Sequence, residues 1–242
     1  MASATGISED SGHMSDNGEQ SPLLGGAGDV QQEEDAPIQH NLILGTGIIA
    51  QAGIWILVAL IWSGILSHPL LFFSPHPLLN SAAFLLVTQA ALILQPTHTA
   101  SQKRLGTYIH AILINLAFLM YLIAFVIIEI NKRSHPETRF KSPHAIMGLV
   151  AYILTCVQWF VGATQFFYPQ IYGGVDNAKK LYKYHRASGY FLFVWITGTI
   201  CAATWTDYNI GILHIHHWSV ITASVILLAG LGARIKKYKF GL

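Results

Sequence analysis

Six apolar segments, each close to the length that crosses a lipid bilayer, constrain this chain more than any other feature. They lie at about 43–66, 77–95, 107–130, 143–167, 184–205 and 210–232. A helix of about 20 residues spans a hydrocarbon core of about 30 Å, so each segment predicts one transmembrane helix. Hydrophobic residues make up 52% of the chain and charged residues only 11%, which is typical of a membrane domain. We therefore expect an all-α membrane protein with six transmembrane helices and both termini on one side.

The first 42 residues have a different composition. They hold eight of the 12 acidic residues, no Lys or Arg, and many Ser, Gly and Gln. Such a segment buries too little apolar surface to offset the entropy of ordering, so we predict a disordered acidic tail over 1–42. The membrane domain then covers 43–233, and a short basic C-terminus covers 234–242. No basic region followed by a short apolar stretch opens the chain, so we expect no cleavable signal peptide.

Within the predicted tail, residues 19–24 read Glu-Gln-Ser-Pro-Leu-Leu. This pattern resembles the acidic dileucine signal that cytosolic sorting adaptors read, and it would direct the protein to a vacuolar, lysosomal or other endomembrane rather than to the plasma membrane. The alternative is that two leucines occur there by chance.

The basic residues predict the orientation of the chain in the membrane. The face that carries the termini holds ten of them: Lys103, Arg104, Lys179, Lys180, Lys183, Arg186, Arg234, Lys236, Lys237 and Lys239. The opposite face holds four: Lys132, Arg133, Arg139 and Lys141. Because Lys and Arg are enriched in cytosolic loops, both termini are predicted to be cytosolic.

Four histidines mark the ends of four consecutive apolar segments. They are His76, His110, His144 and His185. Because consecutive crossings run in opposite directions, His76 and His144 are expected near the non-cytosolic face, and His110 and His185 near the cytosolic face. Two opposed neutral imidazoles supply the axial ligands of an iron porphyrin, and two such sites would give electrons a path across the membrane. The alternative is that each histidine forms an interhelical hydrogen bond.

Residues near these histidines fit a bound porphyrin. Gly148 and Gly189 each lie four residues after a histidine, where a missing side chain lets a flat ring approach the backbone, although helix contacts also favour glycine. Haem propionates need cations, and the candidates are Lys141 before His144 and Arg186 after His185, with Arg139 and Lys183 beside them. The alternative role for these cations is contact with lipid head groups.

Four segments together resemble the haem-ligand signatures of the cytochrome b561 family, particularly its six-helix members without extra domains. They are His76-Pro77-Leu78-Leu79, His110-Ala111-Ile112-Leu113, Ser142-Pro143-His144-Ala145-Ile146-Met147-Gly148 and Tyr184-His185-Arg186-Ala187-Ser188-Gly189. The similarity covers about 65–232. It implies that the second to fifth helices form a central four-helix bundle holding two b-type haems, whose iron is bound by the pairs His76/His144 and His110/His185.

The same resemblance implies an oxidoreductase that transfers electrons from cytosolic ascorbate to a non-cytosolic acceptor, a ferric chelate or monodehydroascorbate. Family members bind ascorbate through basic residues before the third crossing, and Lys103 matches one of them. Thr107 stands where a second lysine is often found, and Ala178 stands in place of an arginine before the fifth-helix histidine. The cations near these positions could still attract an anionic donor: Lys103, Arg104, Lys179 and Lys180.

Other polar residues receive weaker interpretations. His214, His216 and His217 cluster at the non-cytosolic start of the last segment, with His135 in a nearby loop, and could capture a ferric or cupric ion or form an interfacial polar patch. Three polar side chains within the spans favour interhelical hydrogen bonds, with haem contact as the alternative: Asn115, Gln158 and Gln165. Cys156 and Cys201 are expected to be free thiols.

Two further functions stay open on the sequence alone. One is a haem-bearing membrane anchor that relays electrons between a partner dehydrogenase and quinone. The other is a haem-free transporter or scaffold whose histidines relay protons or hold helices together. The sequence shows no nucleic-acid module, and it leaves open whether two chains pair as a homodimer.

Overall fold

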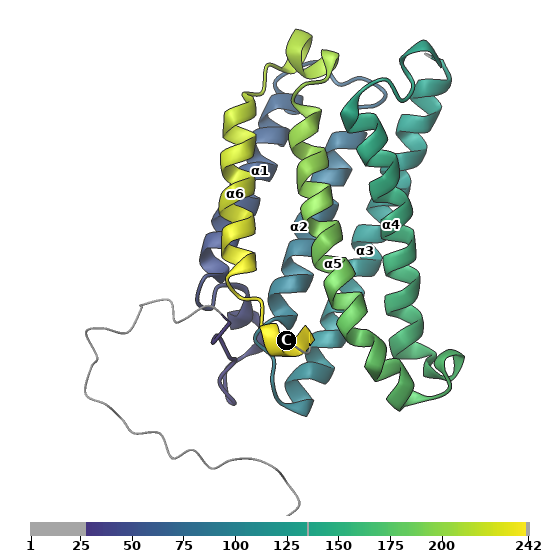
Figure 1. The fold of residues 1–242 in the computed structure, drawn as a ribbon. Coiled ribbons are helices and arrows are strands. Elements are labelled where there is room, and N and C mark those ends of the chain that lie inside the picture. Colours follow the sequence, from purple (N-terminus) through teal and green to yellow (C-terminus); the bar gives the residue numbers. More distant parts are fainter. Residues whose placement is uncertain (1–27, 135, 241–242) are drawn as a thin grey trace, which may run out of the picture.

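A computed structural model describes residues 28–134 and 136–240. It contains six α-helices: α1 (Gly47–Leu66), α2 (Pro75–Leu94), α3 (Ala100–Arg133), α4 (Pro143–Phe167), α5 (Val175–Ala203) and α6 (His217–Gly232) (Figure 1). Short helical turns lie between and after them: η1 (Ile38–Leu42), η2 (Pro136–Thr138), η3 (Pro169–Tyr172), η4 (Asn209–Leu213) and η5 (Lys237–Phe240). The described residues form no strand, and the predicted all-helical fold is confirmed.

Local sequence signals place the starts of three helices that carry the candidate histidines. Pro75 and Pro143 occupy the first turns of α2 and α4, where a missing backbone N–H costs nothing. The Ser142 side chain also caps α4 by accepting from the backbone N–H of Ala145. At α3, Thr99 and Gln102 form a capping box that satisfies backbone donors on both sides of the helix start. The helix starts, and hence the histidine positions, follow from these residues.

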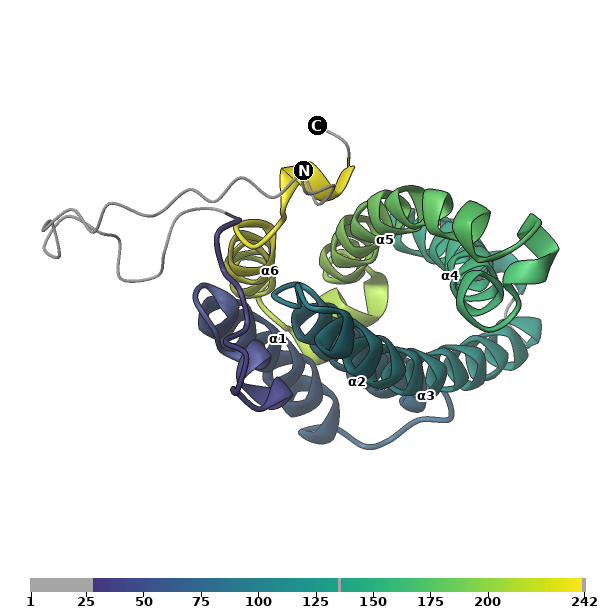
Figure 2. The same cartoon turned by 90° about the horizontal axis from the view of Figure 1, so that it is seen from below.

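Figure 2 shows α2, α3, α4 and α5 arranged around the middle of the bundle, with α1 and α6 together on one side. The contacts agree, because α2 pairs closely with α3, α4 with α5, and α1 with α6. Both ends of the described chain lie at the lower end in Figure 1, which we call the terminal end. The opposite end is called the far end.

Glycines let α1 and α6 approach to backbone contact. A Cβ added to Gly53 would lie 2.4 Å from the backbone nitrogen of Leu227, and one added to Gly230 would lie 2.3 Å from that of Ala50. Small residues at such crossings are how membrane helices gain close contact. The main apolar core continues from this crossing into α2 and α5, where the rings of Phe84 and Phe193 lie 4.6 Å apart. α1 and α6 therefore buttress one side of the four-helix bundle.

Four helices, α1 to α4, are long and apolar enough to cross a membrane. α5 has 29 residues, but its first turns carry Lys179, Lys180 and Lys183. α6 is apolar but has only 16 residues, a length of about 24 Å. The six predicted crossings therefore match six helices in position, and the length and composition of four of them match a bilayer.

The boundary of the predicted N-terminal tail needs correction. Residues 1–27, including the candidate sorting signal at 19–24, lie outside the described residues. Residues 28–42 do not extend away as a tail but fold against the terminal end of the bundle. Asn41 is fully buried, and its side-chain amide donates to Gln32 Oε1 and to the Ile93 carbonyl, both at 2.9 Å. Composition missed this because contacts with distant parts of the chain, including the buried amide of Asn41 and the packing of Leu42 against the main core, hold the segment in place.

Candidate functional site

The structure places the four histidines as two groups at opposite ends of the four-helix bundle. His76 and His144 lie in the first turns of α2 and α4 at the far end. His110 and His185 lie about three turns into α3 and α5, near the terminal end. We call them the far-end pair and the terminal-end pair.

The far-end pair consists of two rings that lie close together with nearly perpendicular planes. The ring centroids of His76 and His144 lie 6.4 Å apart, with an interplanar angle of 84°. A metal held between two imidazoles lies about 2 Å from each coordinating nitrogen, which places the ring centroids about 6 Å apart. The spacing of this pair would therefore suit two nitrogen ligands of one metal ion.

Hydrogen bonds fix which nitrogen of each far-end ring is free. Nδ1 of His76 lies 3.1 Å from the carbonyl oxygen of Ala124, and Nδ1 of His144 lies 2.9 Å from that of Thr199. A carbonyl only accepts, so each Nδ1 carries the proton and each Nε2 keeps its lone pair. A backbone partner of this kind is typical of metal-binding histidines, because it orients the ring and sets the tautomer.

A second polar contact joins the far-end pair to α4. The Tyr152 hydroxyl donates to Asn80 Oδ1 at 2.9 Å, and Asn80 Nδ2 lies 3.3 Å from His76 Nδ1. Asn80 is one turn after His76, so its amide also donates to the His76 carbonyl at 2.7 Å. The bond from Tyr152 to Asn80 holds the start of α2 against α4.

The terminal-end pair is arranged differently. His110 Nδ1 donates to the Ala90 carbonyl of α2 at 3.0 Å, which frees its Nε2 as at the far end. His110 and His185 are close enough to interact electrostatically. No ring contact joins them in the part of the chain that the structure describes.

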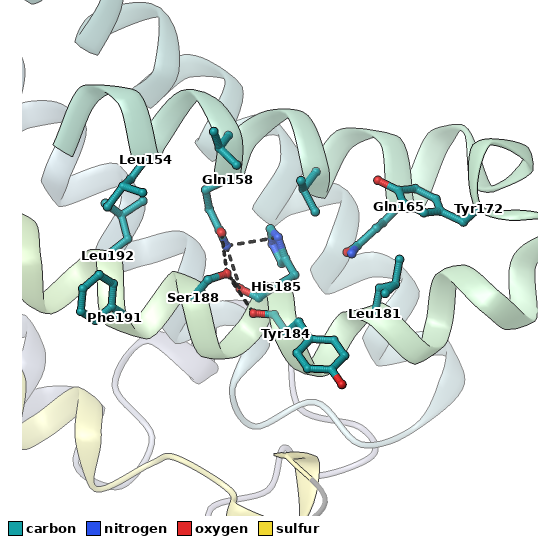
Figure 3. A pocket seen from close by; sticks show the side chains of 12 residues that line it. Leu154, Gln158, Gln165, Tyr172, Leu181, Tyr184, His185, Ser188, Phe191 and Leu192 are labelled. Atoms are coloured by element: carbon teal, nitrogen blue, oxygen red, sulfur yellow. Dashed lines mark hydrogen bonds between the residues drawn. The ribbon is translucent and has the colours of Figure 1, made fainter. Parts of the chain in front are cut away.

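His185 lies against α4 rather than against a backbone carbonyl. Its Nδ1 is 3.1 Å from Gln158 Nε2, and the same amide nitrogen donates to the His185 carbonyl at 2.7 Å (Figure 3). In this arrangement Nδ1 accepts, so the proton of the neutral ring lies on Nε2. Turning the Gln158 amide would present Oε1 to Nδ1 and free Nε2 for a metal, but it would break the bonds of this amide to the His185 carbonyl and the Ser188 hydroxyl.

Gly162 makes room for the His185 ring. A Cβ added to Gly162 would lie 2.7 Å from His185 Cε1, closer than ordinary contacts allow. His185 also lines a cavity of about 400 Å³ between α4 and α5, together with Gln158, Gln165 and Tyr172 (Figure 3). The ring therefore has open space on one side and a helix backbone on the other.

The two glycines predicted to admit a cofactor have different surroundings. A Cβ on Gly148 would meet only Thr199 Cγ2, at an ordinary 3.8 Å. A Cβ on Gly189 would lie 3.0 Å from Gln158 Nε2. Gly189 thus leaves space for the amide that contacts His185.

The predicted cations around the site are dispersed. Arg139 pairs with Glu129, and Lys141 is exposed at the far end. Arg186 donates to the backbone carbonyl of Lys239, and its guanidinium lies 5.7 Å from the centre of the Phe240 ring. Among the predicted donor-binding residues, Lys179 contacts Asp176 and Lys180 contacts Asn177 on their own helix. Lys103 and Arg104 are exposed, and Lys103 interacts electrostatically with Lys236 and Lys239.

The remaining predicted residues are placed as follows. Rings of His216 and His217 stack, and His217 stacks on Trp205. His135 lies outside the described residues, and no cluster of three His, Cys, Asp or Glu side chains suited to a metal occurs among the described ones. Both cysteines are free, as predicted. Asn115 accepts from the Trp159 indole at 3.0 Å, which joins α3 to α4.

Paired histidines within a bundle of apolar helices define a membrane protein suited to bind a metal-containing cofactor. Residues 75–208 match the family described as eukaryotic cytochrome b561. The match covers more than half of the chain, so the chain belongs to this family. Membership and the four apolar helices together make it an integral membrane protein.

Curated relatives are distant. The transmembrane ascorbate-dependent reductase CYB561 of Mus musculus is 26% identical over 163 residues, which cover 67% of this chain and 63% of the relative. The Homo sapiens protein of the same name gives the same values. The ascorbate-specific transmembrane electron transporter 2 of Zea mays is 24% identical over 125 residues, 51% of this chain and 52% of the relative. The chain thus spans less than two thirds of these relatives, and no solved structure matches it significantly.

Membership in the family implies haem b, and the far-end residues fit it. With that ring spacing and free Nε2 atoms, His76 of α2 and His144 of α4 would each offer one nitrogen ligand. At the terminal end His110 offers a free Nε2, and His185 would offer one after the Gln158 amide turns.

Sequence reasoning missed four contributors to these sites, three backbone carbonyls and one glycine. The carbonyls of Ala90, Ala124 and Thr199 leave no trace in side-chain identity. Gly162 lies 23 residues before His185, and only the pairing of α4 with α5 brings them together. Helical spacing within α4 could have signalled Gly162, because it lies four residues after Gln158 on the same face.

Proposed function

We propose that this protein transfers electrons across a membrane, from ascorbate on the cytosolic side to an acceptor on the other side. The observation that carries the proposal is the far-end pair, in which the centroids of two imidazole rings lie 6.4 Å apart with both Nδ1 atoms bound to backbone carbonyls. Two histidines that served only to hydrogen-bond neighbouring helices would not need this distance between their rings. The names of the mammalian and maize relatives, which specify ascorbate, support the same reading.

We further propose a topology of six crossings, with the terminal end in the cytosol. The cations in the loops and segments at that end support this orientation, because Lys and Arg are enriched on the cytosolic side. The helices α2 to α5 then carry one histidine pair near each membrane face. The acidic N-terminal residues and the basic residues after α6 would both lie in the cytosol.

His76 with His144, and His110 with His185, are proposed to bind one haem b each. When bound, a haem with two nitrogen ligands is a one-electron carrier without an open position for oxygen. The helices hold the four rings, and the carbonyls of Ala124, Thr199 and Ala90 set the tautomers of His76, His144 and His110. The proposed acceptor is a ferric chelate or monodehydroascorbate.

An absorption spectrum tests the function directly. Full-length protein, purified with haem supplied during expression, should show reduced low-spin b haem on addition of ascorbate. A haem-free protein would contradict the proposal and favour a transporter or scaffold. Reduction only by a dehydrogenase partner would contradict it and favour a membrane anchor.

A further inference from the structure

The segment after α6 folds back over the terminal end of the bundle. Lys239 Nζ donates to the carbonyls of Gln95 and Thr97, at 3.4 and 3.3 Å, where α2 ends. On the other side, Arg186 of α5 donates to the Lys239 carbonyl, and the Phe240 ring lies 6.1 Å from that of Tyr190. The segment therefore bridges α2 and α5 (Figure 1).

Two cations of this segment are buried. Arg234 is 1% exposed and Lys236 is 5% exposed. Arg234 donates to the carbonyls of Asn41 and Leu92, which locks the start of the segment to the bundle. The ammonium of Lys236, in contrast, has no hydrogen-bond partner among the described residues. A buried ammonium without a partner is costly unless an anion binds to it.

Lys236 belongs to a group of like charges, which we call the basic cluster: Lys103, Arg186, Lys236 and Lys239. Burial, followed by repulsion from Lys236, Arg186 and Lys103, lowers the pKa of Lys239 to about 8. Burial and the neighbouring cations Arg234 and Lys103 also lower the pKa of Lys236. Asp29 opposes this shift as an acidic neighbour of Lys236. Asp29 supplies one negative charge against four cations, so the cluster keeps an excess of positive charge.

We propose that the basic cluster binds the anionic electron donor, with Lys236 and Lys239 of the C-terminal segment supplying charges that the loops before α3 and α5 lack. The inference rests on the proposed function. Thr107 and Ala178 are uncharged, and Ala178 is buried. Arg186 directly follows His185, so an anion bound to the cluster lies beside the terminal-end pair. A small organic anion with several oxygen atoms suits three ammonium groups and a guanidinium.

The same oxyanion chemistry has a second source, because a haem propionate also carries a carboxylate. The lysines would have a different role in each case, depending on whether they bind the donor or a haem propionate. A donor site governs how reduction depends on donor concentration, whereas a propionate site governs whether haem stays bound. The experiment separates these properties.

The test compares Lys236→Gln/Lys239→Gln with Lys237→Gln in the full-length, haem-loaded protein. Lys237 is the exposed neighbour, so the control also removes a positive charge from the segment. We expect the ascorbate concentration for half-maximal reduction rate to rise about tenfold in the double variant and to change little in the control. The rate with an uncharged reducing dye should stay the same in both.

A second readout does not use electron transfer. Ascorbate should protect the half-buried Lys239, but not the exposed Lys237, from an amine-acylating reagent, as measured by mass spectrometry of the wild-type protein. The variant Lys236→Arg/Lys239→Arg should restore the wild-type ascorbate dependence, which separates lost charge from a folding defect.

Two outcomes would overturn the inference while leaving the proposed function intact. One is an unchanged ascorbate dependence in the double variant. The other is a double variant that loses one haem while reduction of the remaining haem depends normally on ascorbate concentration. That result would show that the cluster binds a haem propionate. A wild-type protein that ascorbate does not reduce would instead refute the proposed function.

Discussion

At the far end both imidazoles hydrogen-bond to a backbone carbonyl of a neighbouring helix, whereas at the terminal end only His110 does so. His185 meets the side chain of Gln158 instead. A backbone carbonyl accepts and cannot rotate, but an amide side chain can present either a donor or an acceptor. The far-end pair therefore has its tautomers set by the fold, and the terminal-end pair has one ring whose tautomer depends on a rotamer.

The surroundings of the far-end pair are also more fixed than those of the terminal-end pair. The far-end rings lie close together at the starts of two helices, where Pro75 and Pro143 fix the backbone. His185 lies between the Gly162 backbone and a cavity, next to the basic cluster. We infer that the far end is the more rigid site and that the terminal end adapts to what binds there.

The largest effect is expected from removing one ligand at each end. His144→Ala should abolish haem binding at the far end only, and His185→Ala should abolish it at the terminal end only, because the two pairs share no residue. Each variant should keep half of the wild-type haem per protein, measured by pyridine haemochrome absorbance. Full retention in either variant would remove that histidine from the ligand set.

A methyl group at Gly162 should disturb the terminal end alone. The added Cβ would lie 2.7 Å from His185 Cε1, and overpacking of this kind costs about 1–3 kcal/mol. Gly162→Ala should therefore lower haem retention at the terminal end on heating or dilution. Gly148→Ala is the matched control, since its Cβ meets only Thr199 at 3.8 Å. Equal losses in both variants would argue against a specific role for Gly162.

Gln158→Glu should convert the adjustable tautomer at His185 into a fixed one. A carboxylate accepts from Nδ1–H, which frees Nε2 and makes it a stronger ligand. We expect the midpoint potential of one haem to fall by on the order of 50 mV, about a tenfold change in a one-electron equilibrium. Spectroelectrochemical titration would measure it. An unchanged pair of potentials would show that Gln158 does not set the tautomer of His185.

The smallest effect concerns pH and the terminal end. Burial and then Lys236, Arg186 and Lys103 lower the pKa of Lys239 to about 8, so Lys239 loses its charge as the pH rises through that value. The affinity for ascorbate should accordingly fall by about threefold between pH 7 and pH 9. Stopped-flow reduction at several ascorbate concentrations would measure the decrease. Lys239→Gln should flatten this pH dependence, and a dependence that persists would assign it to another group.

Much of the fold followed from the chain itself. The six apolar segments predicted all six helices within a few residues at most ends, because length and hydropathy are local properties. The tail boundary failed because Asn41 and Gln32 are held by contacts with a distant part of the chain. An Asn or Gln that is buried and hydrogen-bonded cannot be told from an exposed one by its place in the sequence.

The candidate site shows the same division. Spacing and antiparallel crossing were enough to predict that His76 and His144 would share one end, and the structure places their ring centroids 6.4 Å apart, with the ring planes nearly perpendicular. The roles of Gly162 and Gln158 required the pairing of α4 with α5. The basic cluster required the fold-back of the C-terminal segment onto Lys103 and Arg186, which are distant in sequence.

The sequence by itself determined the class of protein, the helices, and which end of the bundle each histidine occupies, because apolar length and helix direction are carried by neighbouring residues. The tertiary structure decided which nitrogen of each ring is free, how closely the rings approach, and which cations gather beside His185. Those properties depend on backbone carbonyls and side chains from other helices, which come together only when the helices associate.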